Sequence, residues 1–248
     1  MDISASLEYA SPMKIRGERE CTECGTRWSY YVTGSVDCPG CGSLRSVGID
    51  EWTEHTDHRV SFDLTPVRSE IDEISTSDLA DRARERCREY VTRRGFVRGG
   101  DLRELDDTYL AATELAHVAD VISRSRRLDE REELYFLSLL RGADEGARPP
   151  VEEVPRSLRA ARGIAYTESV DAYRRDLRTW MGRRELTALE RSCFETLGDH
   201  VTRLRMLDGD VDPEVAERLV EATRDLADGL TGDEDALVRA RERMDALG

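Results

Sequence analysis

Residues 21–24 read Cys-Thr-Glu-Cys and residues 38–41 read Cys-Pro-Gly-Cys, so two cysteine pairs flank the 13 residues 25–37. Four thiolates that arrive as two close pairs suit tetrahedral Zn²⁺, which binds cysteine sulfur at about 2.3 Å. A glycine follows each pair and lets the chain turn so that backbone N–H groups can point at sulfur. We therefore predict one metal site, with the ligands Cys21, Cys24, Cys38 and Cys41.

This ligand set predicts a structural role for the metal. Four thiolates leave no coordination position for water or substrate, so we expect no catalysis there. Zinc is the expected ion, and iron, which accepts the same ligands, is the alternative. The other two cysteines, Cys87 and Cys193, are expected as small core residues on apolar helical faces. Four of six thiols in metal-ligand spacing favour a reducing, cytoplasmic compartment.

The charge of the chain is strongly acidic. Asp and Glu number 52 against 37 basic residues, a formal net charge of −15, and Lys14 is the only lysine. Acidic, arginine-rich composition of this kind resembles cytosolic proteins of halophiles that accumulate salt, in which the Debye length falls to about 3 Å. We interpret the charge as a sign of habitat rather than of partners. An acidic mesophilic helical protein is the alternative interpretation.

The sequence predicts neither a membrane span nor a signal peptide. No stretch approaches 18 consecutive apolar residues. Residues 1–10 carry Asp2 and Glu8 and lack a basic region followed by an apolar one. We expect a protein that does not bind membranes.

The N-terminal part of the chain has the pattern of a small three-stranded β ribbon. Residues 27–33 have the aromatic and β-branched content of a strand, residues 34–35 predict a turn, and residues 44–52 predict a return strand. A sheet this small buries too little apolar area to fold alone, so the metal must contribute to its stability. Trp28 and Tyr30 are expected to form a small core over the cysteines, with a platform that stacks bases as the alternative.

The rest of the chain predicts an all-α bundle of six to eight helices, with no strand after about residue 65. The expected organisation is a zinc ribbon over residues 1–58, a linker over 59–76 and a helical domain over 77–248, with a candidate subdivision at 142–154. The expected starts of helices are Asp101 with Glu104 for a helix to about residue 127, Asp129 with Glu132, Asp212-Pro213, and Thr231 with Glu234. Gly99-Gly100 is expected to separate two helices.

The histidines do not predict an active site. His55 and His58 could bind a second metal only weakly and are expected as exposed linker residues. Glu114 and His117 have the spacing of half a di-iron carboxylate–histidine motif, but no second motif accompanies them. We expect His117 to be an ordinary surface or core residue. No phosphate-binding loop, dinucleotide fingerprint or nucleophile elbow occurs.

The two cysteine pairs with their glycines resemble the zinc ribbon of the transcription factor IIB type, which is also found in archaeal transcription factor B and in RNA-polymerase subunits. An acidic, lysine-poor chain with this ribbon followed by helices is similar to a family of uncharacterised haloarchaeal transcription factor IIB-type zinc-ribbon-containing proteins. The resemblance implies the ribbon fold and the four cysteines as zinc ligands. The helical part shows no pair of cyclin-like repeats, so we do not expect a general transcription factor.

The charge of the ribbon bears on what it binds. Between residues 13 and 48 five basic side chains accompany four acidic ones, and Zn²⁺ with four thiolates changes the sum from +1 to −1. Phosphate binding favours a concentrated basic face. We therefore expect a non-enzymatic adaptor or regulator that docks onto a protein partner, associated with transcription or another nucleic-acid machine. Direct DNA or RNA binding by the ribbon is the alternative, and an enzyme with a site in the helical domain comes third.

Overall fold

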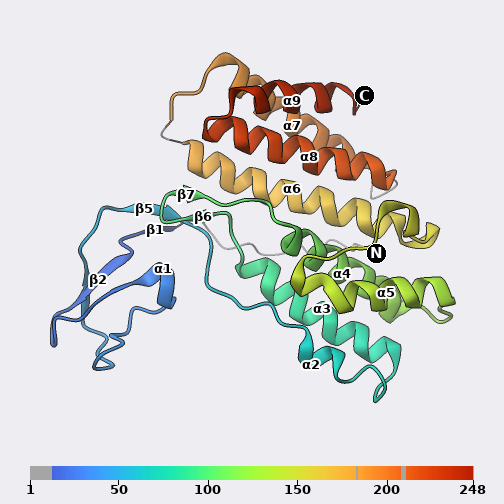
Figure 1. The fold of residues 1–248 in the computed structure, drawn as a ribbon, viewed down its shortest axis with the longest axis horizontal. Coiled ribbons are helices and arrows are strands. Elements are labelled where there is room, and N and C mark those ends of the chain that lie inside the picture. The colour runs from blue at the N-terminus through green and yellow to red at the C-terminus, as the bar shows by residue number, and fades with distance from the viewer. Residues whose placement is uncertain (1–12, 183, 208–210, 248) are drawn as a thin grey trace. The chain divides into compact units, whose positions relative to one another are not determined.

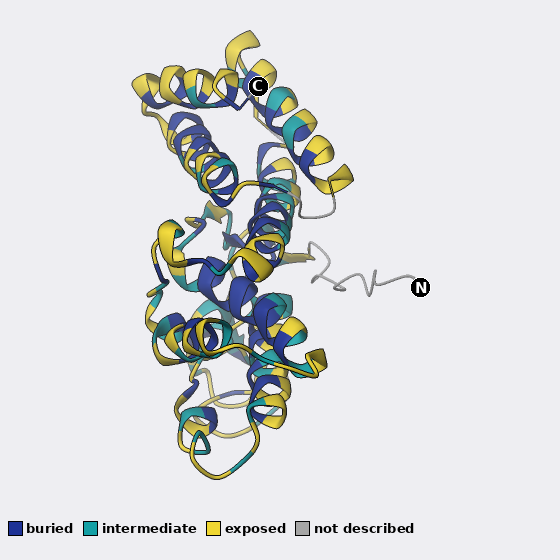
Figure 2. Ribbon diagram, turned by 90° about the vertical axis from the view of Figure 1, so that its right-hand side faces the viewer, coloured by how far each residue is buried: buried dark blue, intermediate teal, exposed yellow. Residues whose placement is uncertain are grey.

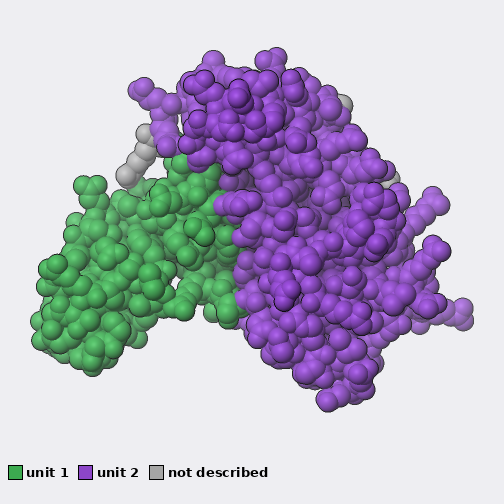
Figure 3. Space-filling view, viewed as in Figure 1, with its two compact units in different colours: residues 1–61, 92–103, 175–183 green, residues 62–91, 104–174, 184–248 purple. Residues whose placement is uncertain are grey.

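The computed structural model describes residues 13–182, 184–207 and 211–247 (Figure 1). The described chain divides into two compact units, each described separately below (Figure 3). Unit 1 combines residues 13–61, 92–103 and 175–182. Unit 2 holds the remaining described residues and is helical. The chain therefore builds unit 1 from three separate segments.

A three-stranded antiparallel sheet forms the ribbon, as predicted. Strand β2 (Glu18–Cys21) lies between β3 (Arg27–Ser29) and β4 (Ser46–Gly48). Arg19 is opposite Trp28 on one side and opposite Gly48 on the other. A second, two-stranded sheet pairs β1 (Met13–Ile15) with β5 (Thr53–His55).

The strand predicted over residues 27–33 ends early. Tyr30–Thr33 form one helical turn, α1, which Gly34 closes with a φ of 69°. Only one of the two expected core aromatics lies over the cysteines: Trp28 is buried with Cys21 and Cys38. The helical turn takes Tyr30 out of the strand's alternation, and its ring instead meets His55 edge to face at 5.8 Å. The small core is therefore correct for Trp28 and wrong for Tyr30.

A short hairpin, β6 (Val97–Arg98) and β7 (Asp101–Leu102), contradicts the expectation that no strand follows residue 65. Gly99 and Gly100 form its turn with φ of 61° and 88°. Two successive residues with positive φ are what a tight hairpin turn of this hand requires. Gly99-Gly100 therefore connects two strands, and does not separate two helices as expected.

The segment that follows β5 is buried, although residues 55 and 58 were expected to be exposed. His55, Thr56 and Asp57 are 2%, 1% and 3% exposed, and His58 is half-buried. The Thr56 hydroxyl donates to Asp176 Oδ2 at 2.6 Å. Asp57 forms ion pairs at 3.2 and 2.9 Å with two arginines, Arg94 and Arg98. These contacts give the Thr56 hydroxyl and the Asp57 carboxylate partners in the interior, and all of them lie within unit 1.

Seven helices of twelve residues or more appear among the described residues, in agreement with the six to eight predicted. They are α3 (Thr76–Arg93), α4 (Asp107–Arg124), α5 (Glu130–Gly142), α6 (Arg159–Met181), α7 (Ala188–Met206), α8 (Pro213–Thr231) and α9 (Glu234–Asp245), with a single turn, α2 (Thr65–Arg68), before them. Figure 2 shows buried residues along one side of the outer helices and exposed residues along the other. Within the described residues, no helix has the length and apolarity needed to cross a bilayer.

The helix starts follow local capping signals in part. Asp129 and Glu132 form the predicted capping box, and Asp212 caps α8 ahead of Pro213. The start predicted at Asp101 is wrong, because residues 101–102 belong to the hairpin and Asp106 caps α4 instead, accepting from the Tyr109 N–H at 2.8 Å.

The start predicted for the last helix is also displaced. Asp233, not Thr231, caps α9, and its side chain accepts from two backbone N–H groups. Thr231 is the last residue of α8, and its hydroxyl donates to the Ala227 carbonyl at 3.0 Å. Aspartate at 233 meets the capping requirement as well as threonine would.

Candidate metal centre

Two backbone turns of nearly identical geometry present the four cysteines. In the first, the Cys21 N–H donates to Thr26 O at 2.9 Å and the Gly25 N–H to Cys21 O at 3.0 Å. The second repeats both bonds, from Cys38 to Ser43 and from Gly42 to Cys38, at 2.9 and 2.8 Å. Gly25 and Gly42 each have a φ of 72°, a left-handed conformation that glycine adopts without strain. The two cysteine pairs are therefore equivalent halves of one site.

Backbone donors also point at the sulfurs, as the glycines predicted. The Glu23 N–H donates to Cys21 Sγ, and the Gly40 N–H donates to Cys38 Sγ, both at 3.4 Å. Hydrogen bonds of this kind disperse the negative charge of thiolates and orient them toward a metal.

The four sulfur atoms fit a tetrahedral ion. All four lie within 4.8 Å of one another, with Cys21 Sγ 3.7 Å from Cys41 Sγ and Cys24 Sγ 3.5 Å from Cys38 Sγ. A tetrahedron with Zn–S bonds of about 2.3 Å has edges of about 3.8 Å, so little movement would seat the ion. The predicted ligands Cys21, Cys24, Cys38 and Cys41 thus come together and could hold one metal ion.

Burial divides the site into two sides. Cys21 and Cys38 are 1% and 2% exposed and pack against Trp28, whereas Cys24 and Cys41 are exposed. Hydrogen bonds from the Thr26 hydroxyl and backbone lower the pKa of the Cys24 thiol to about 6, which favours the thiolate that binds metal. Because all four donors are cysteine sulfurs, the set has the composition of a closed, structural site.

The histidines do not extend this centre. Among the described residues, the four cysteines are the one cluster of three or more metal-ligating side chains. The rings of His55 and His58 lie 5.8 Å apart, and Asp57 beside them is occupied by its two arginines. The arrangement does not form a second metal site.

Burial of His55 predicts that unit 1 loses stability in acid. Two effects lower the pKa of His55 from 6.5 to about 4: burial is the larger, and the charge of the nearby His58 is the smaller. As the pH falls, the unfolded chain therefore takes up a proton at His55 before the folded chain does. The free energy of unfolding of unit 1 then has its full value above about pH 6.5. It declines as the pH falls toward 4, with a slope of at most about 1.4 kcal/mol per pH unit. Tryptophan-monitored urea unfolding at several pH values measures this decline.

The matched variant for this prediction is His55→Phe, which keeps a ring against Tyr30 and Tyr31. Thiolate ligands also take up protons in acid, so the informative quantity is the difference between wild type and variant. A variant with the same pH dependence between 6.5 and 4 would contradict the assignment to His55.

The two residues of the partial di-iron motif face different partners. Glu114 is completely buried and accepts hydrogen bonds from Tyr135 and, at 3.0 Å, from Tyr166. His117 is partly exposed and instead meets Glu168 at 3.0 Å. His117 as an ordinary surface or core residue stays a prediction, and Glu114 belongs to a cluster that the sequence did not predict.

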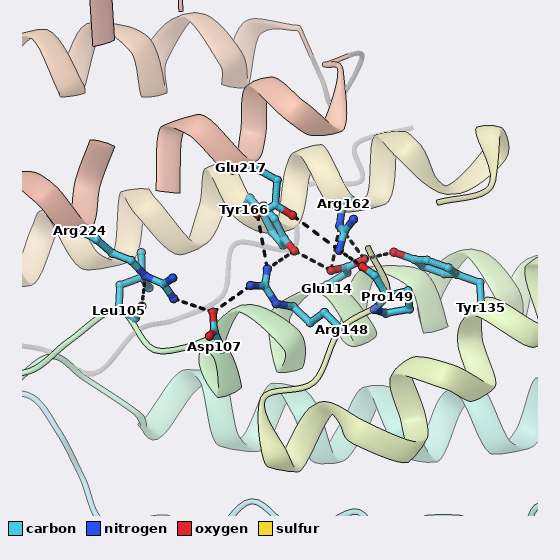
Figure 4. A network of polar contacts seen from close by, with 10 residues as sticks. All are labelled: Leu105, Asp107, Glu114, Tyr135, Arg148, Pro149, Arg162, Tyr166, Glu217 and Arg224. Carbon is cyan, nitrogen blue, oxygen red and sulfur yellow. Dashed lines mark hydrogen bonds and ion pairs between the residues drawn. The ribbon is translucent and has the colours of Figure 1, made fainter. Parts of the chain in front are cut away.

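That cluster is an ion-pair network within unit 2 that is buried at Glu114 and Arg162 and reaches the surface at Asp107 (Figure 4). Arg162, 1% exposed, lies 3.1 Å from the Glu114 carboxylate and donates to the Pro149 carbonyl at 2.8 Å. Three carboxylates and three guanidinium groups alternate through the network, contributed by Asp107, Glu114, Glu217, Arg148, Arg162 and Arg224. The charges balance, which suits a network that joins helices rather than one that binds an ion.

The only sequence signal for this network was indirect. Glu114 stands among apolar residues of a helix, a position where a carboxylate must find a partner. Nothing in the local sequence identifies Arg162, 48 residues away, as that partner.

A four-cysteine ribbon followed by an all-α body defines a metal-ribbon protein with a helical domain. The model of DUF7117, a family of unknown function, matches residues 13–244, and the chain belongs to this family. The match extends over both the ribbon and the helices. No curated protein and no solved structure matches the chain.

Proposed function

We propose that this protein is a non-enzymatic adaptor or regulator whose ribbon docks onto a protein partner. The observation that carries the proposal is the pairing of the ribbon's basic residues with acids. Lys14 meets Glu54 at 3.3 Å, Arg27 meets Glu20 at 2.6 Å, and Arg45 meets Glu23 at 3.6 Å. A protein that binds phosphates gathers its cations on one face instead.

The other two ribbon arginines serve the ribbon itself. Arg16 donates to the Gly48 carbonyl at 3.3 Å and stacks over Trp52 at 5.3 Å. Arg19 donates to the Ser46 hydroxyl at 3.0 Å. These contacts hold β4, and among the ribbon residues that the structure describes they leave no cluster of free cations, which supports docking over direct DNA or RNA binding.

The proposal includes one structural zinc ion bound by Cys21, Cys24, Cys38 and Cys41. Zinc prefers closed tetrahedral thiolate sites, and the sulfur spacing is close to the edge of such a tetrahedron. Zinc cross-links the two cysteine turns and so stabilises a sheet whose strands of three and four residues are too short to be stable alone. Iron in the same ligands is the alternative, and metal analysis of the purified protein distinguishes the two.

The resemblance of the two cysteine pairs to transcription factor IIB-type ribbons favours a partner in transcription or another nucleic-acid machine, in the cytoplasm of a salt-accumulating archaeon. In this proposal residues 1–58 dock, residues 59–76 connect, and residues 77–248 form the interaction body, with 142–154 as its internal boundary.

A pull-down from the native host at high salt, with and without nuclease, tests the proposal. We expect protein partners that are retained after nuclease treatment and lost with the Cys38→Ser variant, whose ribbon should not fold. Partners that disappear with nuclease would instead support direct nucleic-acid binding. Turnover of a small molecule by the purified protein would contradict a non-enzymatic role.

A further inference from the structure

The strand register separates the ribbon sheet into two faces. Glu20 is opposite Arg27 on β3 and opposite Val47 on β4, so these three side chains share one face. The Ile49 N–H donates to the Glu18 carbonyl at 2.8 Å, which continues the ladder by one pair and adds Ile49 and Glu18 to the same face. We call this set the outer face: Glu18, Glu20, Arg27, Val47 and Ile49.

The opposite face is already covered. It carries Arg19, Cys21 and Trp28, and both Cys21 and Trp28 are buried against the second cysteine turn. Only the outer face is therefore available to a partner that docks flat on the sheet.

The free edge of β4 is closed to an added strand. The Ser46 carbonyl accepts from Arg19 Nη2 at 3.2 Å, and the Gly48 carbonyl accepts from Arg16 Nη1 at 3.3 Å. A partner strand would have to displace both arginines to reach these groups. At β4 a partner can therefore dock through side chains on the outer face, but not by adding a strand to the edge.

The outer face combines apolar and acidic character. Val47 and Ile49 are 49% and 47% exposed and lie two residues apart on one face, so they form an adjacent pair of exposed aliphatic side chains. Glu18 beside Ile49 is exposed and forms no ion pair with a described residue, whereas Glu20 is paired with Arg27. The unpaired Glu18 carboxylate gives the outer face a negative charge, which attracts a lysine or arginine of a partner.

Building on the proposed docking function, we propose that the outer face binds a protein segment that carries aliphatic side chains flanked by lysine or arginine. The aliphatic side chains cover Val47 and Ile49, and the basic group pairs with Glu18. Acidic side chains on the same face would repel a phosphate backbone, so nucleic acid is the wrong chemistry for this surface.

Photo-cross-linking with the full chain tests the proposal. Benzoylphenylalanine is placed at position 47, or at position 238 on α9 as a control, where the native valine is 51% exposed. We expect a protein adduct from position 47 alone, in a segment that mass spectrometry shows to contain aliphatic and basic residues. An adduct with nucleic acid, with an acidic segment, or with equal yield from position 238 would overturn the proposal.

Affinity for the cross-linked protein provides the second measurement. The double variant Val47→Ser/Ile49→Ser should weaken binding about tenfold, since two half-exposed aliphatic side chains lose their remaining burial. Val238→Ser should leave affinity unchanged, and bound metal should stay at the wild-type level in both proteins. Unchanged affinity of the double variant would overturn the proposal.

The two proposals fail in different ways. Partners that survive nuclease in the pull-down but give no adduct from position 47 exclude the outer face and leave docking intact. An absence of any nuclease-resistant partner removes both.

Discussion

Replacing Cys38 with serine is expected to release the metal and unfold the ribbon while unit 2 keeps its helices. Cys38 is 2% exposed and supplies one of four sulfurs that close the site. Zinc binding to such sites contributes roughly 10–16 kcal/mol of apparent free energy, far more than three short strands can replace. Metal content should fall from one ion per chain to a substoichiometric level.

Tryptophan fluorescence reports this loss selectively. All three tryptophans, Trp28, Trp52 and Trp180, belong to unit 1, whereas the helical signal in circular dichroism comes chiefly from unit 2. We expect a large change in fluorescence with little loss of helicity. Cys193→Ser, at a buried position of α7, is the matched control and should retain metal. A Cys38→Ser protein with stoichiometric metal and native fluorescence would refute the site.

Arg162→Ala is expected to lower the free energy of unfolding of unit 2 by about 3–5 kcal/mol. The substitution leaves the Glu114 carboxylate at 0% exposure without its cation and removes the donor to the Pro149 carbonyl. Urea unfolding followed by circular dichroism measures the change.

The double variant Glu114→Gln/Arg162→Met separates the cost of an unpaired charge from the value of the pair. The carbonyl oxygen of glutamine can accept from one of the two tyrosines that contact Glu114, and its NH2 group can donate to the hydroxyl of the other. No charge stays buried, so we expect most of the lost stability to return. Arg218→Ala, which breaks an exposed pair with Glu214 on α8, should change stability by less than about 1 kcal/mol. A similar loss in Arg162→Ala and Arg218→Ala would show that burial does not matter here.

The features that the sequence predicted correctly are local ones. The cysteine spacing with its glycines, the capping box at Asp129 and Glu132, and the cap at Asp212 each depend on residues a few positions apart. The number of helices was also predicted, although the starts expected at Asp101 and Thr231 were displaced. Such signals stay informative because their physical cause lies within one turn of backbone.

Some of the errors arise where distant segments meet, and the hairpin at Gly99-Gly100 is a local one. Residues 55–57 have the polar sequence of a linker, yet they are buried. Two distant arginines pair with Asp57 there, and Asp176 accepts from Thr56. Gly99-Gly100 is compatible with a break between helices as well as with a hairpin turn, and pairing of β6 with β7 decides between them. The Glu114–Arg162 pair joins two helices whose sequences carry no mark of each other.

The three-segment composition of unit 1 has a consequence for how the protein is made. The cysteine turns are complete once residue 43 has left the ribosome, so the metal can bind early in synthesis. By contrast, the hydrogen bonds that the Thr56 hydroxyl and the Phe96 N–H donate to Asp176 cannot form until residue 176 has been synthesised. We therefore expect a nascent chain that holds its metal through the synthesis of about half the protein before the rest of unit 1 can close.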